Sequence, residues 1–154
     1  MSPLSAQAWL DAPVPPSLGV EGARLVRMQA LQEARGLLTV GEVERHIPFP
    51  PRRYFVISGV PDENIRGEHA HLAQHQLLVC LAGRVTAEVD DGKARAAVVL
   101  DTPRAALYMS PMVWGAQHHY SRDAILLVLA SHEYDPADYV RDYARFAELA
   151  RAPR

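Results

Sequence analysis

The chain has 154 residues, of which 49% are hydrophobic and 22% are charged, a balance typical of one globular domain with a single core. Its formal net charge of −2 gives no strong field that would attract nucleic acid or an anionic membrane surface. We find no signal peptide and no apolar run of about 18 residues, so we expect a cytoplasmic protein without a membrane span. The single cysteine, Cys80, lies in an apolar run and is expected to be an inert core residue.

Residues 1–22 are predicted to form an irregular N-terminal arm, because they contain four prolines and little hydrophobic periodicity. Trp9 and Leu10 can dock this arm on the body of the protein or on a partner subunit. A frayed terminus is the alternative. The remaining residues, 23–154, are predicted to be one domain.

Short strands separated by turn residues fill most of this domain. The expected strands cover residues 25–30, 37–40, 54–57, 76–81, 85–89, 96–100, 106–109 and 124–129. Asp91-Gly92 stands between two of them and is a strong signal for a β-hairpin. Many short strands at close spacing predict an all-β fold, either a sandwich, a jelly roll or a barrel.

The spacing of hydrophobic residues changes in the last segment of the chain. Asp135-Pro136 has the residues of a helix N-cap followed by proline in the first turn. Tyr139, Tyr143, Phe146 and Leu149 then recur at helical spacing. We therefore expect a C-terminal helix that packs its aromatic stripe on the outside of the β structure, with a ligand-binding role for these aromatics as the less favoured alternative.

The most informative motif is Gly67-x-His69-x-His71-x4-Gln76-x6-Gly83. Two histidines at positions i and i+2 project from the same face of a strand. Two neutral imidazoles can bind a metal, or they can transfer protons near neutral pH. Gln76 favours proton transfer, because a neutral amide is a weaker ligand for a divalent cation than a carboxylate.

The motif resembles the first motif of the cupin superfamily, which usually has glutamate in place of Gln76. Pro111 to Gly115, followed by His118 and His119, resembles the second cupin motif. This resemblance implies a cupin-type double-stranded β-helix, or jelly-roll barrel, here with a C-terminal α-helix.

Further blocks resemble the WxcM-like sugar ketoisomerases, typified by dTDP-4-keto-6-deoxyglucose 3,4-ketoisomerase. These blocks are Ile47–Phe49, Arg53, Arg66–His71, Gln76–Gly83, Asp90–Gly92, Leu100–Pro103, Leu107–Trp114, Val128–Ser131, Tyr134–Asp135 and Asp138–Tyr143. The resemblance implies that the carbonyl of a nucleotide-linked keto-sugar moves from C4 to C3 without a metal or other cofactor. It implies that His69 and His71 are the catalytic residues, one of them removing the C3 proton and the other shuttling protons. The protein is also expected to be a homodimer, because cupin barrels commonly pair through edge strands.

One departure from the family concerns a tyrosine. The family commonly has two tyrosines shortly after the arginine that matches Arg53, and one of them takes part in the active site. That place falls on Phe55 or Val56 here. Tyr54 is one position out of step, so on a regular strand it faces the opposite way.

The remaining candidates are predicted to bind substrate. Arg53 and Arg66 can pair with the diphosphate of a sugar nucleotide, because guanidinium matches phosphate oxygens geometrically. Gln76 can hold the tautomer of His71 or a sugar hydroxyl. The other predicted substrate-binding residues are Tyr108 and Trp114, which can line the sugar or pack in the core, and His118, a possible third polar group on the wall.

Two other functions stay open from the residues alone. A metal-dependent cupin enzyme would use His69, His71 and His118 as ligands. A non-catalytic cupin would bind a sugar nucleotide without converting it.

Overall fold

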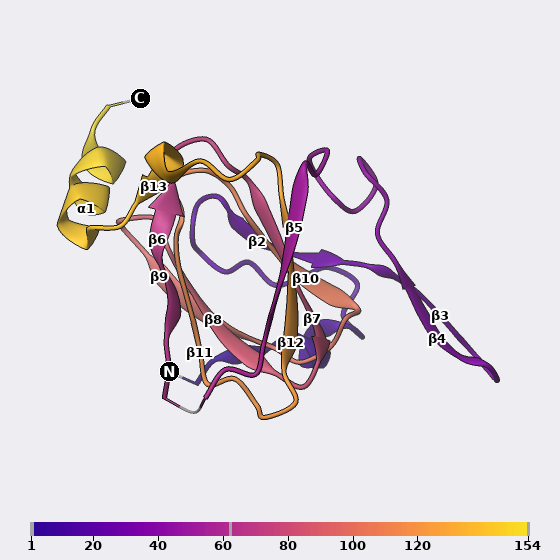
Figure 1. Ribbon diagram of the computed structural model, residues 1–154. Coiled ribbons are helices and arrows are strands. Elements are labelled where there is room, and N and C mark those ends of the chain that lie inside the picture. The colour runs from indigo at the N-terminus through magenta and orange to yellow at the C-terminus, as the bar shows by residue number, and fades with distance from the viewer. Residues whose placement is uncertain (1, 62, 154) are drawn as a thin grey trace.

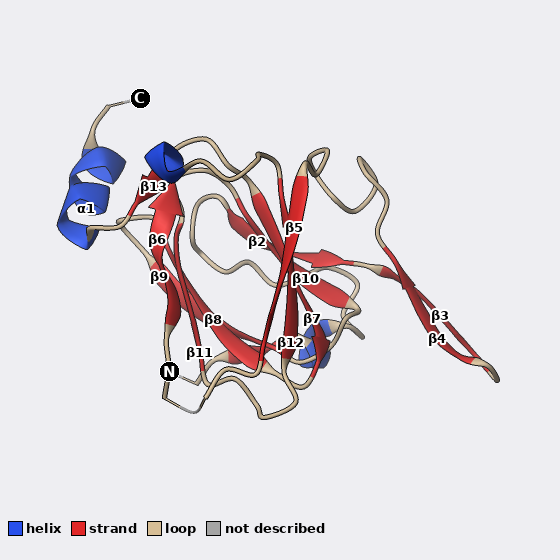
Figure 2. Ribbon diagram, viewed as in Figure 1, coloured by secondary structure: helices blue, strands red, loops and turns tan. Residues whose placement is uncertain are grey.

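The computed structural model describes residues 2–61 and 63–153 and contains two packed β-sheets (Figures 1 and 2). One sheet has the strand order β1 (Leu4–Ser5), β9 (Arg95–Leu100), β8 (Val85–Asp90), β11 (Trp114–His118), β6 (Arg66–His71), β13 (Tyr139–Val140). The other has the order β2 (Ala23–Arg27), β10 (Ala105–Met109), β7 (Gln76–Ala82), β12 (Ile125–Ala130), β5 (Arg53–Ser58). The predicted all-β jelly roll is therefore confirmed.

The main hydrophobic core lies between the two sheets and includes Leu78 of β7, Val85 of β8 and Leu126 of β12, all at most 1% exposed. The N-terminal arm contributes to the same core. Its short strand β1 pairs in parallel with β9, and the 3-10 helix η1 (Gln7–Trp9) buries the side chain of Trp9. The arm is thus docked on its own chain over these residues.

Most strands form where the sequence predicts them, and the Asp91-Gly92 turn connects β8 to β9 as an antiparallel hairpin. Gly92 has a φ of 90°, a left-handed conformation that glycine adopts without strain. The predicted strand 25–30 is divided between β2 and β3, which belong to different sheets, and the prediction missed β1, β11 and β13. Two of these strands have only two residues, too few for a periodic pattern.

The predicted C-terminal helix starts too early and must be corrected. Asp135 caps only the 3-10 helix η2 (Pro136–Asp138), after which Tyr139 and Val140 form β13 against the edge of β6. A second N-cap, Asp142, accepts a hydrogen bond from the backbone N–H of Arg145 and starts α1 (Tyr143–Arg151). The aromatic spacing therefore spans two elements, and only the residues from Tyr143 onward are helical.

Helix α1 packs on the outside of the first sheet, as the sequence predicts. Phe146 is fully buried there, with Ala70 of β6 and Val140 of β13. Trp114 belongs to the same small core and lies 5.5 Å from Phe146 between ring centroids. This contact anchors the segment that carries β13 beside the strand with the two histidines.

The hairpin of β3 (Gln29–Glu33) and β4 (Gly36–Val40) forms a two-stranded sheet of its own and projects away from the barrel (Figure 1). Leu31 and Leu38 are cross-strand partners and are 51% and 55% exposed. An isolated two-stranded hairpin is marginally stable in water, so exposed leucines on its face are unusual.

Among the described residues, no helix has the length and apolar character needed to cross a membrane. The longest helix, α1, has 9 residues.

Candidate functional site

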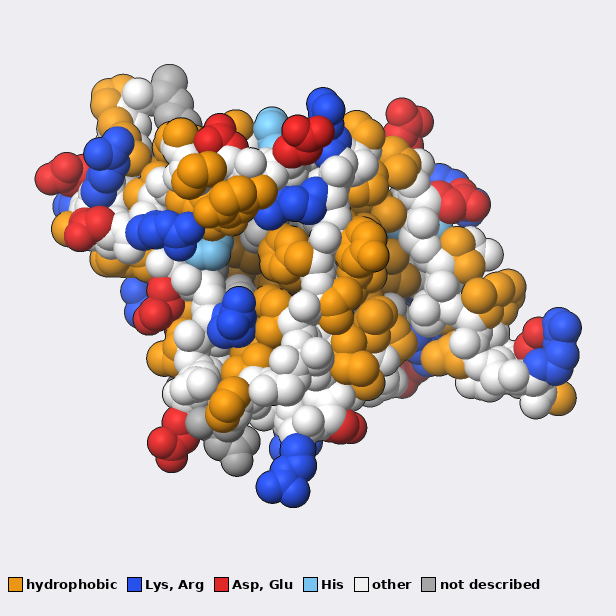
Figure 3. Space-filling model, viewed as in Figure 1, with side chains coloured by type: hydrophobic (Ala, Val, Ile, Leu, Met, Phe, Trp, Pro, Cys, Tyr) orange, Lys and Arg blue, Asp and Glu red, His pale blue; other side chains and the backbone are white. Residues whose placement is uncertain are grey.

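A cavity of about 260 Å³ lies between the two sheets and opens between β6 and β5. Its apolar wall comes from the second sheet, with Ile57 of β5, Leu78 of β7 and Val128 of β12. Its polar wall comes from β6, β11 and the segment after η2. Figure 3 shows the hollow on this face, with histidine and cationic side chains beside it. The cavity thus has one side suited to an apolar group and one side suited to hydroxyl groups.

A bulge in β6 aims the two histidines into this cavity. Gly67 and Glu68 have φ values of 83° and 57°, and the pairing of β6 with β11 shifts register between Gly115 and Ala116. Such a bulge bends a strand and re-aims the side chains that follow it. His69 and His71 then line the same cavity with ring centroids 4.9 Å apart, as expected for i and i+2 on one strand face.

His69 presents a free nitrogen to the cavity. Its Nδ1–H donates to the carbonyl oxygen of Gly67 at 3.0 Å, so Nε2 carries the lone pair. Burial lowers the pKa of His69, the hydrogen bond to Gly67 opposes this effect, and the positive charge of Arg141 adds to it. The imidazole is therefore neutral at pH 7, and its Nε2 can accept a proton.

His71 is held from both sides. Its Nδ1–H donates to Asp138 Oδ2 at 2.9 Å, and its Nε2 lies 3.4 Å from the amide nitrogens of Gln74 and Gln76. Burial lowers the pKa of His71 to about 4, and the nearby His69 adds to this effect, although Asp138 opposes it. His71 is thus a neutral imidazole whose two nitrogens both have partners, unlike His69.

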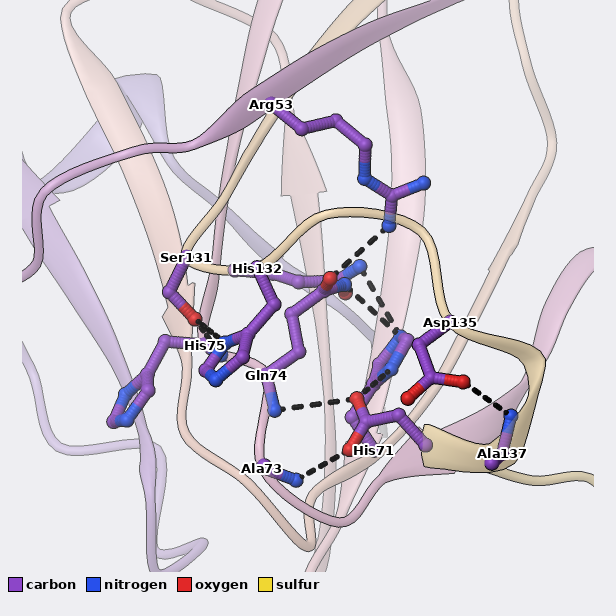
Figure 4. A network of polar contacts seen from close by, with 11 residues as sticks. Arg53, His71, Ala73, Gln74, His75, Ser131, His132, Asp135 and Ala137 are labelled. Carbon is purple, nitrogen blue, oxygen red and sulfur yellow. Dashed lines mark hydrogen bonds and ion pairs between the residues drawn. The ribbon is translucent and has the colours of Figure 1, made fainter.

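The orientation of the Gln74 amide follows from Arg53. The guanidinium of Arg53 has only donors and donates to Gln74 Oε1 at 3.0 Å, so the amide nitrogen must face His71 Nε2. A directed chain of hydrogen bonds therefore runs from Arg53 through Gln74 and His71 to Asp138, and Figure 4 shows this network. This series of hydrogen bonds fixes the tautomer of His71.

Asp138 is also fixed by the backbone. Its carboxylate accepts from the N–H of Ala73 at 2.7 Å and from the N–H of Gln74 at 3.3 Å. Its side chain is only 13% exposed, so these donors and His71 replace most of its hydration.

Tyr139 and Arg141 form part of the polar wall, and the sequence prediction did not assign them to the site. The Tyr139 ring lies 4.8 Å from the His69 ring and 4.5 Å from the His71 ring, centroid to centroid. The guanidinium of Arg141 lies 4.2 Å from the Tyr139 ring centroid, a cation–π geometry. Arg141 is exposed, so it brings a positive charge to the mouth of the cavity.

The structure brings together four of the predicted site residues on the cavity wall, namely Arg66, His69, His71 and Gln76. Arg53 acts one step away, through Gln74. Tyr108, Trp114 and His118 lie outside this cavity: Tyr108 bonds His75, Trp114 packs on α1, and His118 bonds Glu88. Gln74, Gln117, Asp138, Tyr139 and Arg141 belong to the site and were missed.

The strand β5 places Phe55, and not a tyrosine, at the cavity. Phe55 lines the wall, whereas Tyr54 points outward and is 70% exposed. This agrees with the expected alternation along a strand. No phenol hydroxyl from β5 reaches the cavity within the described part of the chain.

The groups around the two histidines are poor ligands for a metal ion. Within residues 2–61 and 63–153, no three His, Cys, Asp or Glu side chains have an arrangement that could hold a metal ion. The groups nearest to His71 Nε2 are amide nitrogens, which do not bind cations.

Comparisons with known proteins identify a family and a relative of this chain. The model of the FdtA family, described as WxcM-like, C-terminal, matches residues 21–151. The TDP-4-oxo-6-deoxy-alpha-D-glucose-3,4-oxoisomerase of Aneurinibacillus thermoaerophilus is 37% identical over 123 residues, 80% of this chain and 88% of that protein.

Several solved structures are also similar to this chain. The sugar 3,4-ketoisomerase QdtA from Thermoanaerobacterium thermosaccharolyticum, in complex with TDP, is 32% identical with a TM-score of 0.82 and covers 85% of this chain and 96% of that chain. A histidine-to-asparagine variant of the same enzyme was solved with TDP-4-keto-6-deoxyglucose; it is 31% identical with a TM-score of 0.83 and covers 86% and 96%. The RmlC epimerase of Mycobacterium tuberculosis shares the fold, at 20% identity and a TM-score of 0.68, and covers 82% of this chain and 71% of that chain.

Replacing Asp138 by Asn tests the hydrogen-bond chain. An amide offers one oxygen where the carboxylate offers two, so one or two of the three donors at Asp138 lose their partner. We expect a free energy of unfolding lower by about 1–3 kcal/mol, measured by urea denaturation, and a mixture of His71 tautomers in ¹⁵N NMR spectra. The control is Asp135→Asn, because asparagine caps a helix as well as aspartate does. A single unchanged His71 tautomer in Asp138→Asn would contradict the assignment.

Proposed function

The chain belongs to the WxcM-like, C-terminal family, and from this membership we propose that it is a sugar-nucleotide ketoisomerase that moves a carbonyl from C4 to C3 of a TDP-4-keto-6-deoxyhexose. The observation that carries the proposal is the Nε2 of a neutral, cavity-lining His69, which has no partner among the described residues. Homology to 3,4-ketoisomerases extends over most of the chain and supports the same reaction.

The reaction needs a base, a stabilised intermediate and a returned proton. We assign His69 as the base that takes the proton from C3, because its Nε2 is unprotonated and has no protein partner among the described residues. The electron pair of the C3–H bond forms a C3–C4 double bond, and the C4 oxygen becomes an enediolate oxygen. A proton then moves from the C3 oxygen to the C4 oxygen, and C4 takes a proton from the His69 imidazolium, which leaves the carbonyl at C3 and His69 neutral again.

His71 is assigned to proton transfer and not to the first abstraction. Its Nε2 already faces the amides of Gln74 and Gln76, so its lone pair is less available than that of His69. Its Nδ1–H is bound to Asp138, which stabilises the imidazolium that forms when Nε2 takes a proton. His71 is therefore suited to pass protons between the substrate oxygens.

The cavity dimensions and charges fit a nucleotide-linked sugar. About 260 Å³ is smaller than the roughly 300–1,000 Å³ of pockets for drug-sized ligands, so we place the hexose ring inside and the nucleotide beyond the mouth. Arg66 and Arg141 are exposed on the polar wall, where they can pair with the diphosphate. The apolar wall around Leu78 and Val128 suits the C6 methyl group of a deoxy sugar.

A homodimer is part of this proposal. The hairpin of β3 and β4 exposes Leu31 and Leu38 on one face, and the edge strand β5 exposes Tyr54 and Val56 at 70% and 49%. Figure 3 shows hydrophobic side chains gathered on this side of the molecule. A second copy that covers these surfaces would bury them and protect the open edge.

Replacing His69 or His71 by Asn tests the catalytic assignment. Asn removes the base while keeping a polar group, and loss of general acid–base catalysis costs about 10²–10⁴-fold in rate. We expect each variant to lose turnover to this extent, and His69→Asn to lose exchange of the C3 hydrogen with solvent deuterium, followed by NMR. The control is His118→Asn, which lies outside the cavity. Near-normal turnover in both variants would rule out the mechanism, whereas a large loss in His118→Asn would favour a different site.

The pH dependence follows from His69. Protonation removes its lone pair, so kcat/KM falls as the pH decreases, and burial lowers its pKa below the ordinary 6.5. We expect kcat/KM to be constant near neutral pH and to decline with an apparent pKa below 6.5 in acid. A midpoint above 6.5, or a rate that increases toward acid, would contradict a neutral His69 base.

Chelator treatment separates the proposal from a metal-dependent cupin. We expect turnover to survive dialysis against EDTA, because Gln76 replaces the usual glutamate and contacts His71 through its amide nitrogen. Loss of turnover that one divalent ion restores would overturn the metal-free assignment.

Two negative charges introduced on the hairpin of β3 and β4 test the dimer. We expect a dimer by sedimentation at micromolar concentration, and a monomer for the double variant Leu31→Asp and Leu38→Asp, since burying two carboxylates in an apolar interface is costly. Val14→Asp is the matched control, because Val14 is 70% exposed on the N-terminal arm. A monomeric wild-type protein would refute the dimer.

A further inference from the structure

Gln117 of β11 is a buried amide on the cavity wall that the mechanism above does not use. It is 9% exposed and lines the cavity with Arg66 and His69. Its side chain makes no hydrogen bond to any residue in the described ranges, although its amide has two donors and one acceptor. Among the described residues, three polar side-chain atoms are buried from solvent and have no hydrogen-bond partner, namely Trp9 Nε1, Arg53 Nε and the Tyr120 hydroxyl. The amide atoms of Gln117 are not in this group. The hydrogen-bonding capacity of Gln117 is thus available to the contents of the cavity.

The backbone around Gln117 is shaped to hold its amide beside His69. A Cβ atom on Gly67 would lie 2.9 Å from Gln117 Oε1 and 2.9 Å from the carbonyl oxygen of Gly115, whereas a Cβ on Gly115 would meet the side chain of Met109 first. Gly67 is also the residue whose carbonyl accepts from His69, and Gly115 is the strand partner of His69. The lack of a Cβ on Gly67 and the bulge in β6 therefore leave room for the amide next to the base.

The chemistry of the amide limits what it can bind. A neutral group with donors and an acceptor suits a hydroxyl, which can both accept and donate, whereas phosphate is matched better by the arginines at the mouth. A buried polar group that lacks its partner costs free energy, so a site of this kind discriminates against a ligand without the matching hydroxyl.

We infer that Gln117 is a specificity-determining residue that hydrogen-bonds a hydroxyl of the hexose ring held over His69. This inference rests on the proposed function. Different residues then bind the two halves of the substrate: the arginines bind the nucleotide diphosphate, and Gln117 binds only the sugar.

The test compares a ligand with the sugar and a ligand without it. Gln117→Met keeps the side-chain length and removes the amide. Calorimetry in the His69→Asn background, where the ligand is not converted, gives Kd for TDP-4-keto-6-deoxyglucose and for TDP. We expect the variant to weaken binding of the sugar nucleotide about tenfold, the worth of one hydrogen bond, and to leave the Kd for TDP within about twofold. Gln7→Met, an exposed glutamine of the arm, is the matched control.

The possible failures are distinct. An unchanged Kd for the sugar nucleotide in Gln117→Met, with turnover intact in the wild-type protein, overturns this inference and leaves the proposed function standing. Equal weakening for both ligands also overturns it, because the change then acts on the fold or the mouth. A wild-type protein that neither binds nor converts TDP-4-keto-6-deoxyglucose overturns both. In the otherwise wild-type protein, KM should rise about tenfold, with a smaller change in kcat.

Discussion

The polar half of the site depends on the hydrogen bond between His71 and Asp138. The carboxylate orders three donors at once: the imidazole and the N–H groups of residues 73 and 74. This fixes the loop after β6 and, together with Arg53 acting through the Gln74 amide, the tautomer of His71. The position of His69, two residues earlier on the same strand, is set by the Gly67 carbonyl. One face of β6 therefore carries two imidazoles with different partners and different roles.

The two sheets divide the work at the cavity. The second sheet supplies a rigid apolar wall from strands that are buried on both faces, such as β7. The first sheet supplies polar groups where its regularity is broken, at the bulge in β6 and at the short edge strand β13. Irregular backbone at the edge of a regular sheet lets polar side chains enter an otherwise apolar interior while their hydrogen bonds stay satisfied.

The sequence alone predicted the parts of the site that lie on one strand. Period-2 alternation places His69 and His71 together and turns Tyr54 away from the cavity, since both follow from local geometry. The prediction left Phe55 and Val56 as alternatives, and the structure places Phe55 at the cavity. The contact of Asp138 with His71 could not be predicted from local patterns, because the two residues are 67 positions apart in the sequence. Tyr139 was assigned to a helix because its spacing to Tyr143 and Phe146 matched a helical period across two separate elements. Trp114 and Tyr108 were expected near the substrate, but aromatic side chains on a two-sided sheet can pack on either face, and these pack outside.

The short strand β13 makes the site dependent on the end of the chain. Asp138 and Tyr139 are held by the hydrogen bonds between Asp138 and the end of β6 with its following loop, by two residue pairs with β6 and by the Phe146 anchor of α1, not by the barrel core. Segments with so few buried contacts open locally at a lower free energy than the whole domain. When this segment detaches, His71 loses its carboxylate and both imidazoles lose their aromatic cover, although the barrel remains folded. Heating should therefore inactivate the protein through a local opening that far-UV circular dichroism hardly detects. A ligand that contacts Tyr139 would hold this segment against β6 and raise the temperature of inactivation.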